Sequence, residues 1–372
     1  MKKIIKRIFM VITVFIAGVA VIAGGYMQLP KFGKSPSGKR LERIRQSPNY
    51  KDGSFQNRTE TPSLTEGVSY YTVFKEFFFQ KSKRVEPDSV LPSKKVDLMK
   101  LNPSDDVLVW FGHSSYFMQL DGKRILVDPV LSGSASPIPY TTKSFKGSDV
   151  YKVEELPEID YLFISHDHYD HLDYETIIAL KPKVKKVIVG LGVGEHLEYW
   201  GYNPADIIEE DWNEQVILAD GFVLNTTPAR HFSGRGLKRD GTLWMSYVLS
   251  TPNHKIYIGG DSGYDKHFAE IGEKFGPFDL VFLENGQYDK NWKYIHMQPE
   301  EVVQAAVDLK AKRLFPVHWS KFALALHAWD EPIIRVVRES KKRNLPLLHP
   351  MIGEWVYLND SLQSYNWWEK VK

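Results

Sequence analysis

Residues 161–173 read YLFISHDHYDHLD. The segment opens with four consecutive apolar residues, which are typical of a short buried strand. Three histidines and an aspartate then follow within six positions: His166, His168, Asp170 and His171. A loop in solvent has no need of so many imidazole and carboxylate groups, whereas a metal site requires them. The alternating His166 and His168 can bind one metal ion, and the two donors after them can bind a neighbouring ion.

Three further donor residues share one feature, because each lies shortly after an apolar, strand-like run. They are His231 after residues 222–224, Asp261 after residues 256–258, and His318 after residues 314–315. Loops at one end of a rigid sheet are where site residues gather. Taken alone, His231 or His318 is more often an ordinary polar residue, but in this order after the histidine-rich loop they predict a shared metal site. Zinc suits histidine and carboxylate ligands best, and iron or manganese are the alternatives.

Composition narrows the chemistry. The chain has 372 residues, of which 43% are hydrophobic and 25% charged, as in ordinary globular proteins. It has no cysteine, which excludes disulfides, thiolate catalysis, cysteine metal ligands and the lipid attachment of a lipoprotein. The formal net charge of +2 gives no broad electrostatic attraction to nucleic acid, so nucleic acid is not an expected partner.

The N-terminus predicts a membrane segment. Near its start the chain has four basic residues, Lys2, Lys3, Lys6 and Arg7. An apolar run over residues 8–25 follows them. The run is close to the length that crosses a bilayer as a helix, and basic residues tend to stay on the cytoplasmic side. The alternative is a cleaved signal peptide, since Ala20 or Ala23 could satisfy a peptidase. Both interpretations place the catalytic part outside the cytoplasm, at the periplasmic or extracellular face.

The rest of the chain divides into an extension and a catalytic domain. We expect a signal anchor at 1–28, a linker and wrapping extension at 29–100, and a hydrolase domain at 101–372. Strand-like runs occur at 107–111, 116–120, 124–127, 161–164, 187–189, 216–218, 222–224, 247–249, 256–258, 280–283 and 314–315. Helix-like stretches lie between some of them, including 174–180 and 299–309. This mixture predicts an α/β fold of four αββα layers, preceded by the membrane segment.

An aromatic segment in the extension has two interpretations. Tyr70, Phe74 and Phe77 follow a helical spacing of i, i+4 and i+7, so they share one face of a helix. The helix could dock on the core through this face. It could instead present an apolar surface to lipid.

These residues resemble a known set. His166-x-His168-x-Asp170-His171, followed by His231, Asp261 and His318, looks like the motif set of the metallo-β-lactamase superfamily over about residues 106–350. The presence of Asp170, and an aspartate rather than a cysteine at position 261, look unlike the true β-lactamases. A closer resemblance is to the N-acylphosphatidylethanolamine-hydrolysing phospholipase D family. It rests on the motifs LD at 172–173, PARHF at 228–232, TLW at 242–244, GDSGY at 260–264, HMQPEE at 296–301 and HWSKFAL at 318–324.

The resemblance implies a role for each site residue. One zinc ion would be held by His166, His168 and His231. The other would be held by Asp170, His171 and His318. Asp261 would bridge the two ions and serve catalysis, and His296 would be a catalytic histidine that binds no metal. The N-terminal anchor and residues 30–100 depart from the family pattern, which leaves the substrate entrance open.

Other polar residues near these motifs have competing explanations. His296 could cap the helix that starts at Pro299 instead of serving the reaction. His113 is expected to support a ligand or the fold, and Asp128 either orients a ligand histidine or belongs to a turn. The remaining histidines lack such a context and are expected to be ordinary: His196, His254, His267, His327 and His349.

The predicted function is a zinc-dependent phosphodiesterase of phospholipase D type, acting on N-acylated phosphatidylethanolamine or a related phospholipid. A lactonase or other small-ester hydrolase of the same fold is the alternative within enzymes, and a non-catalytic envelope scaffold is the alternative outside them. The expected partners are a lipid or small-molecule substrate and a membrane, with a homodimer as one option for assembly.

Overall fold

Two mixed β-sheets form the centre of the computed structural model, which describes residues 2–79, 82–218, 221–358 and 365–371. The first sheet has seven strands in the order β15 (Trp355–Tyr357), β3 (Val107–Trp110), β4 (Tyr116–Leu120), β5 (Lys123–Val127), β6 (Ile159–Phe163), β7 (Val184–Gly190) and β8 (Ile207–Glu210). The second has six in the order β14 (Leu314–Val317), β13 (Leu280–Glu284), β12 (Lys255–Ile258), β11 (Ser246–Ser250), β10 (Val223–Thr227) and β9 (Gln215–Ile217).

Aromatic side chains from the two sheets meet in the space between them. Phe163 on β6 lies edge-on to Tyr247 on β11, with ring centroids 5.2 Å apart. Tyr116 on β4 stacks on Phe282 on β13 at 4.1 Å. All four side chains are buried, and burying a side chain of this size contributes on the order of 1.5–3 kcal/mol. The sheets therefore pack face to face around one apolar core.

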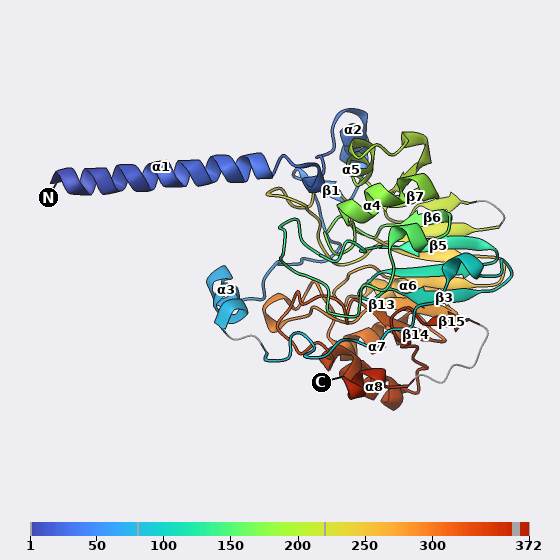
Figure 1. Cartoon of the computed structure of the whole chain (residues 1–372). Helices are drawn as coiled ribbons and strands as arrows, with labels where there is room; N and C mark the ends of the chain where they lie inside the picture. Colours follow the sequence, from blue (N-terminus) through green and yellow to red (C-terminus); the bar gives the residue numbers. More distant parts are fainter. Residues whose placement is uncertain (1, 80–81, 219–220, 359–364, 372) are drawn as a thin grey trace.

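Helices cover the outer faces of both sheets. α4 (Tyr174–Leu180) and α5 (Gly194–Tyr199) pack on the first sheet, where Leu180 and Leu197 join the same apolar cluster as Leu162. α6 (His267–Phe275), α7 (Pro299–Asp308) and α8 (Glu331–Arg343) pack on the second sheet. Figure 1 shows α4 and α5 on one side of the strands and α7 and α8 on the other. The predicted four-layer αββα architecture is confirmed.

Strand direction brings several loops to one edge of this sandwich. β5 to β8 run parallel, and so do β12 to β14. β10 runs in the same direction as β12, because both are antiparallel to β11. At this edge the backbone N–H of Met245 donates to the carbonyl of Ser165 across the two sheets at 3.0 Å. The loops after β6, β10, β12 and β14 consequently converge.

The N-terminal extension begins with α1 (Lys2–Tyr26), which has no buried residue. It is the one helix within the described ranges that is long and apolar enough to cross a membrane, and Figure 1 shows it projecting away from the sandwich. The chain then runs along the body through α2 (Gly38–Gln46) and the hairpin of β1 (Tyr50–Lys51) and β2 (Ser54–Phe55). Arg40 on α2 binds three body carboxylates, those of Glu195, Glu198 and Glu209.

Short 3-10 turns complete the described structure. They span Pro30–Phe32, Leu98–Lys100, Val153–Glu155, Lys181–Lys183, Pro204–Asp206, Lys290–Trp292 and Trp367–Lys370.

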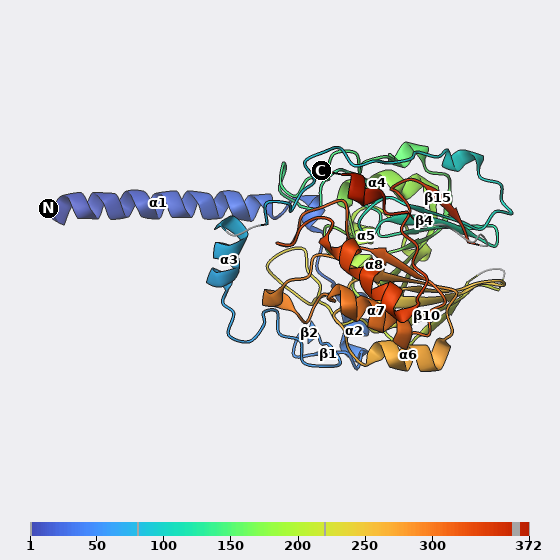
Figure 2. The ribbon, with the colours of Figure 1, turned by 90° about the horizontal axis from the view of Figure 1, so that it is seen from below.

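The aromatic segment forms the predicted helix, α3 (Tyr70–Phe79), but the expectation that it docks on the core is wrong. None of its residues is buried. Figures 1 and 2 show it outside the sandwich, on the side of the molecule from which α1 projects. The helical spacing correctly predicted an apolar face, and the other interpretation, an apolar surface for lipid, stays a prediction.

Candidate metal centre

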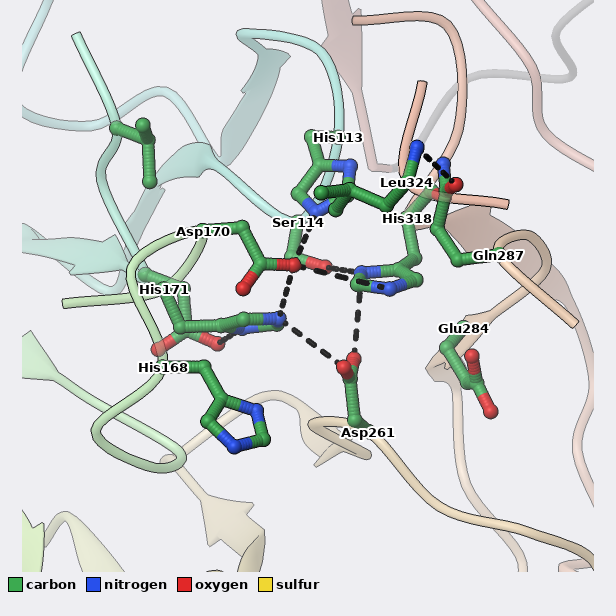
Figure 3. Close-up of polar contacts among 12 residues, drawn as sticks. His113, Ser114, His168, Asp170, His171, Asp261, Glu284, Gln287, His318 and Leu324 are labelled. Carbon is green, nitrogen blue, oxygen red and sulfur yellow. Dashed lines mark hydrogen bonds and ion pairs between the residues drawn. The ribbon is translucent and has the colours of Figure 1, made fainter. Parts of the chain in front are cut away.

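The loops at the shared edge bring all seven predicted donors into one buried cluster. His166, His168, Asp170 and His171 come from the loop after β6. The other three come from the second sheet: His231 after β10, Asp261 after β12 and His318 after β14. Their ligand atoms form overlapping groups in which all atoms lie within 4.8 Å of one another. Figure 3 shows Asp261 in contact with both His171 and His318.

The first group consists of three imidazoles. His166 Nε2 lies 2.8 Å from His168 Nδ1, which in turn lies 3.3 Å from His231 Nε2. Burial lowers the pKa of His168 to about 4, and burial also lowers the pKa values of His166 and His231 well below their usual value. Three neutral rings that point nitrogen lone pairs at one position are suited to a cation.

The second group combines histidine with carboxylate. His171 Nε2 lies 3.5 Å from Asp170 Oδ2 and 3.2 Å from Asp261 Oδ2. His318 Nε2 lies 3.9 Å from the same oxygen of Asp170. Burial lowers the pKa of His171, but the carboxylates of Asp261, Asp170 and Asp128 outweigh burial and raise it well above its usual value. The negative charge around His171 is of the kind that a divalent cation balances.

Asp261 belongs to both groups. Its Oδ2 atom lies 3.2 Å from His171 Nε2, 3.7 Å from His231 Nε2 and 3.9 Å from His166 Nε2. Two buried atoms here, His171 Nε2 and Asp261 Oδ1, have no hydrogen-bond partner among the described residues. Unsatisfied buried polar atoms are costly, and coordination of a metal would satisfy them. The donor set therefore fits two metal ions that share Asp261.

Asp128 holds the histidines of the β6 loop in place. Its Oδ2 atom accepts a hydrogen bond from His171 Nδ1 at 2.8 Å and another from Ser165 Oγ at 2.7 Å. Ser165 Oγ also lies 3.0 Å from His166 Nδ1. A bond to Nδ1 fixes the tautomer and leaves the Nε2 lone pair free for a metal. This contact is the one expected if Asp128 orients a ligand histidine, and the φ of 42° at Asp128 is the left-handed backbone typical of a turn residue.

The N-terminal extension holds His231, which the sequence did not predict. Asn57 Nδ2 donates to the carbonyl of His231 at 2.7 Å, and Asn57 Oδ1 accepts from the backbone N–H of His231 at 3.1 Å. His231 Nδ1 donates to the carbonyl of Ile295 at 2.9 Å. Asn57 lies in a polar stretch without a motif, so no sequence signal indicated this role.

A cavity of about 310 Å³ lies beside His231. Its walls come from the extension, including Asn57 and Thr61, and from the body, including Phe232 and Arg239. The guanidinium of Arg239 lies 4.0 Å from the ring centroid of Phe232 and donates to Ser63 Oγ at 3.1 Å. The extension therefore forms one wall of the space next to the metal donors.

His113 and Ser114 support the second group. His113 Nε2 lies 2.9 Å from Asp170 Oδ2, and Ser114 Oγ lies 2.9 Å from His318 Nδ1. The His113 ring is fully buried, and burial lowers its pKa to about 4. His113 thus meets the expectation that it supports a ligand, and its nitrogen also falls within the cluster of possible donors.

His296 borders the cluster without capping a helix. Gln298 is the N-cap of α7, so the capping explanation for His296 is wrong. His296 Nδ1 lies 2.8 Å from Glu284 Oε2, and Glu284 Oε1 accepts from the backbone N–H of Met297 at 2.9 Å. Burial raises the pKa of Glu284 well above its usual value. Glu284 was not predicted, and its only sequence signal is an acidic residue that ends the apolar run of β13.

Arg235 ties the histidine-rich loop to the extension. Its buried guanidinium donates to the carbonyls of Asp167 and Leu172, at 2.8 and 2.6 Å. It also donates twice to the carbonyl of Lys31, at 3.1 and 2.7 Å.

The histidines that were expected to be ordinary lie outside the possible donor groups of the described residues, and His196 pairs instead with Asp167 at 3.2 Å.

Comparison with known proteins identifies the family. A family model described as "Beta-lactamase superfamily domain" matches residues 123–319, a range that contains all seven donors. An uncharacterised protein of Mycobacterium tuberculosis is 36% identical over 362 residues, covering 95% of this chain and 97% of that protein. N-acyl-phosphatidylethanolamine-hydrolyzing phospholipase D 1 of Caenorhabditis elegans is 31% identical over 297 residues, covering 73% of this chain and 80% of that protein.

A solved structure shares the fold. Igni18, described as a novel metallo hydrolase from the archaeon Ignicoccus hospitalis, superposes with a TM-score of 0.52 at 20% identity. The match covers 68% of this chain and 98% of Igni18. Together, the family match, the relatives and the layered sandwich show that this chain belongs to the β-lactamase superfamily and is a hydrolase of the metallo-β-lactamase fold.

Proposed function

We propose that this protein is a dinuclear zinc phosphodiesterase that hydrolyses N-acylated phosphatidylethanolamine or a closely related phospholipid. The observation that carries the proposal is the carboxylate of Asp261, which faces donors of both histidine groups within 3.2–3.9 Å. A shared carboxylate between two donor groups suits a two-metal hydrolase. The choice of a phospholipid is supported by the 31% identity with the Caenorhabditis elegans phospholipase D.

Six of the donor residues would hold the two metal ions. His166, His168 and His231 would hold one ion, and Asp170, His171 and His318 the other. When bound, zinc lowers the pKa of water and polarises a phosphoryl group. Water adds to phosphorus and the bond to the N-acylethanolamine oxygen breaks, which yields phosphatidic acid and an N-acylethanolamine.

His296 is placed to serve the leaving group. Its Nδ1 is held by Glu284 at 2.8 Å, so Nε2 is the ring nitrogen that can reach a substrate. From there it would donate a hydrogen bond to a phosphoryl oxygen or a proton to the departing alkoxide. The His296 ring centroid lies 5.1 Å from that of His231 and 5.3 Å from that of His318, within reach of a phosphate at the centre.

The helix α1 supports a proposal for where the reaction takes place. A helix of 25 residues with basic residues at its start would anchor the protein with its catalytic body outside the cytoplasm. An enzyme held in this way would meet phospholipids at the outer face of the same membrane.

The test is a substrate panel with purified full-length protein that carries two equivalents of zinc. Long-chain N-acylated phosphatidylethanolamine in vesicles should be cleaved with higher kcat/KM than a short soluble phosphodiester or a simple lactone. The same preparation of Asp261→Asn controls for a contaminating hydrolase. Faster hydrolysis of lactones than of any phospholipid would show that the enzyme is a lactonase on the same metal centre.

A further inference from the structure

The α3 helix exposes an unusual amount of aromatic surface. Six of its ten residues are aromatic, and five of these side chains are between 57% and 78% exposed: Tyr70, Tyr71, Phe74, Phe78 and Phe79. A surface helix of a soluble domain normally buries its apolar face. A contiguous exposed apolar surface of this kind marks a site of interaction with a membrane or another molecule.

Polar contacts hold α3 in this orientation. Glu76 on α3 pairs with Lys290 Nζ at 2.9 Å and with Asn291 Nδ2 at 2.7 Å. Just before the helix, Thr65 N–H and Thr65 Oγ1 donate to the carbonyls of Asn291 and Lys290, at 2.7 and 2.6 Å. After the helix, Trp329 N–H donates to the carbonyl of Arg84 at 2.8 Å. The polar face of α3 is thus fixed to the body, and most of the aromatic side chains are left in solvent.

Two loops at the base of α1 also expose large apolar side chains. Tyr26, the last residue of α1, donates through its hydroxyl to the carbonyl of Pro137 at 2.6 Å. The loop after Pro137 carries Tyr140, which is 86% exposed. On another side, Gly236 lies beside Met27, and the next residue, Leu237, is 90% exposed. Both loops therefore lie where α1 would leave a bilayer.

The arrangement of these parts matches a flat surface. Figures 1 and 2 both show α3 projecting toward the same end of the molecule as α1, with its axis lying across the direction of α1. A helix that crosses a bilayer runs near its normal, so a helix that lies across it runs along the bilayer surface.

Basic side chains surround the exposed aromatic groups. Lys75 lies on α3, Lys143 lies with its Nζ 5.0 Å from the ring centroid of Tyr140, and Lys238 follows Leu237. All three side chains are exposed. Lysine near a membrane surface is attracted by anionic lipid head groups, while aromatic rings favour the interface between head groups and acyl chains.

We propose that α3 and the loops around Tyr140 and Leu237 form a membrane-docking surface, which binds the same lipid bilayer that α1 enters. α3 lies in the head-group region with its aromatic side chains directed at the acyl chains. The proposed function supplies a use for this contact, because a phospholipid substrate would reach the metal centre directly from the bilayer. The contact itself does not require the reaction, so the two proposals can fail separately.

The absence of cysteine in the chain allows a direct test. Phe78→Cys and Tyr140→Cys variants of the full-length protein, each with a nitroxide label, are placed in vesicles that contain anionic phospholipid. Paramagnetic relaxation then compares access of the label to oxygen, which concentrates in lipid, with access to a water-soluble nickel complex. Ile217→Cys is the matched control, since Ile217 is 71% exposed and pairs with Val223 at the end of β10 opposite His231.

Labels at Phe78 and Tyr140 should show high oxygen and low nickel access, and the label at Ile217 the reverse. A water-like signal at Phe78 would overturn the proposal. Should Phe78→Cys fail to fold, Phe79→Cys reports on the same surface, because that side chain is 78% exposed. A short distance between labels on two copies, which disappears as the lipid-to-protein ratio rises, would instead assign the surface to a second copy of this chain and would also overturn it.

Discussion

The two donor groups of the metal centre differ in what holds them. The group around His171 is held from within the sandwich, because Asp128 at the end of β5 fixes its Nδ1 atom. In the group of His166, His168 and His231, the backbone of His231 is held from outside by Asn57 in the extension. The family match begins at residue 123, so Asn57 lies outside it. The His231 side of the centre therefore depends on a contact from the N-terminal extension, in addition to the contacts made within the sandwich.

The largest effect is expected where the two halves meet. Asp261→Asn removes the carboxylate that faces both groups, so both ions should be lost together and activity should fall by about 10³-fold or more. The unaltered protein should contain about two metal ions per chain. Elemental analysis of the purified variant should give a much lower metal content. Asp279→Asn, a carboxylate just before β13, is the control and should keep both ions. Loss of a single ion from Asp261→Asn would show that the halves are independent.

The His296→Asn variant tests whether a residue beside both donor groups serves the substrate without holding a metal ion. His296→Asn should lower kcat by about 10²–10³-fold, because a hydrogen bond or proton to the leaving group is lost. Metal content should stay unchanged, since His296 is held by Glu284 and not by either proposed ion. His349→Asn, a histidine packed against Trp368, provides the comparison and should be fully active. Normal turnover of the His296 variant would end its catalytic assignment.

Asp128→Asn should weaken the His171 half most, because Asp128 contacts His171 directly and reaches His166 only through Ser165. Losing the charge that orients His171 should reduce metal affinity by about 10–100-fold, the usual effect of removing such a partner. Competition with a chelator measures this change, and Asp160→Asn, at the opposite end of β6, should leave affinity as it was. Unchanged affinity in the Asp128 variant would mean that the protein backbone alone positions His171.

The smallest effect is expected from Asn57→Ala, and it should be confined to the other half. Two hydrogen bonds to the backbone of His231 are lost, so one ion should be held about tenfold more weakly while the second is unaffected. The same chelator titration should resolve two steps where the unaltered protein shows one. Asn49→Ala, which removes a contact of the extension to Asp211, serves as the control. Equal weakening of both ions would remove the distinction drawn between the halves.

The metal centre could be predicted from sequence because its signals are local. Each donor follows an apolar run, and parallel strands bring the ends of such runs to one edge, so order along the chain was enough. Asn57 and Glu284 were missed because their roles depend on contacts between distant segments: Asn57 and His231 lie 174 residues apart. No pattern within a short window records such a contact.

The fold was predicted on the same basis and with the same weakness. Apolar runs located most strands of both sheets, but β8 and β15 were not predicted. β8 has only two apolar residues, and β15 is a three-residue run whose partner strand, β3, lies far away in the sequence. The helical spacing of Tyr70 and Phe74 correctly predicted α3. Spacing shows that a helix has an apolar face but not whether that face is covered, and here most of the aromatic side chains of α3 are exposed.

The buried guanidinium of Arg235 connects the segment that follows α1 directly to the histidine-rich loop. The same side chain donates hydrogen bonds to the carbonyl of Lys31 on one side and to the carbonyls of Asp167 and Leu172 on the other. A displacement of the chain near Lys31 would therefore reach the residues next to His166 and His171 through the Arg235 guanidinium. Because α1 ends at Tyr26, shortly before Lys31, a displacement of this helix would shift the loop that carries four of the seven possible metal donors.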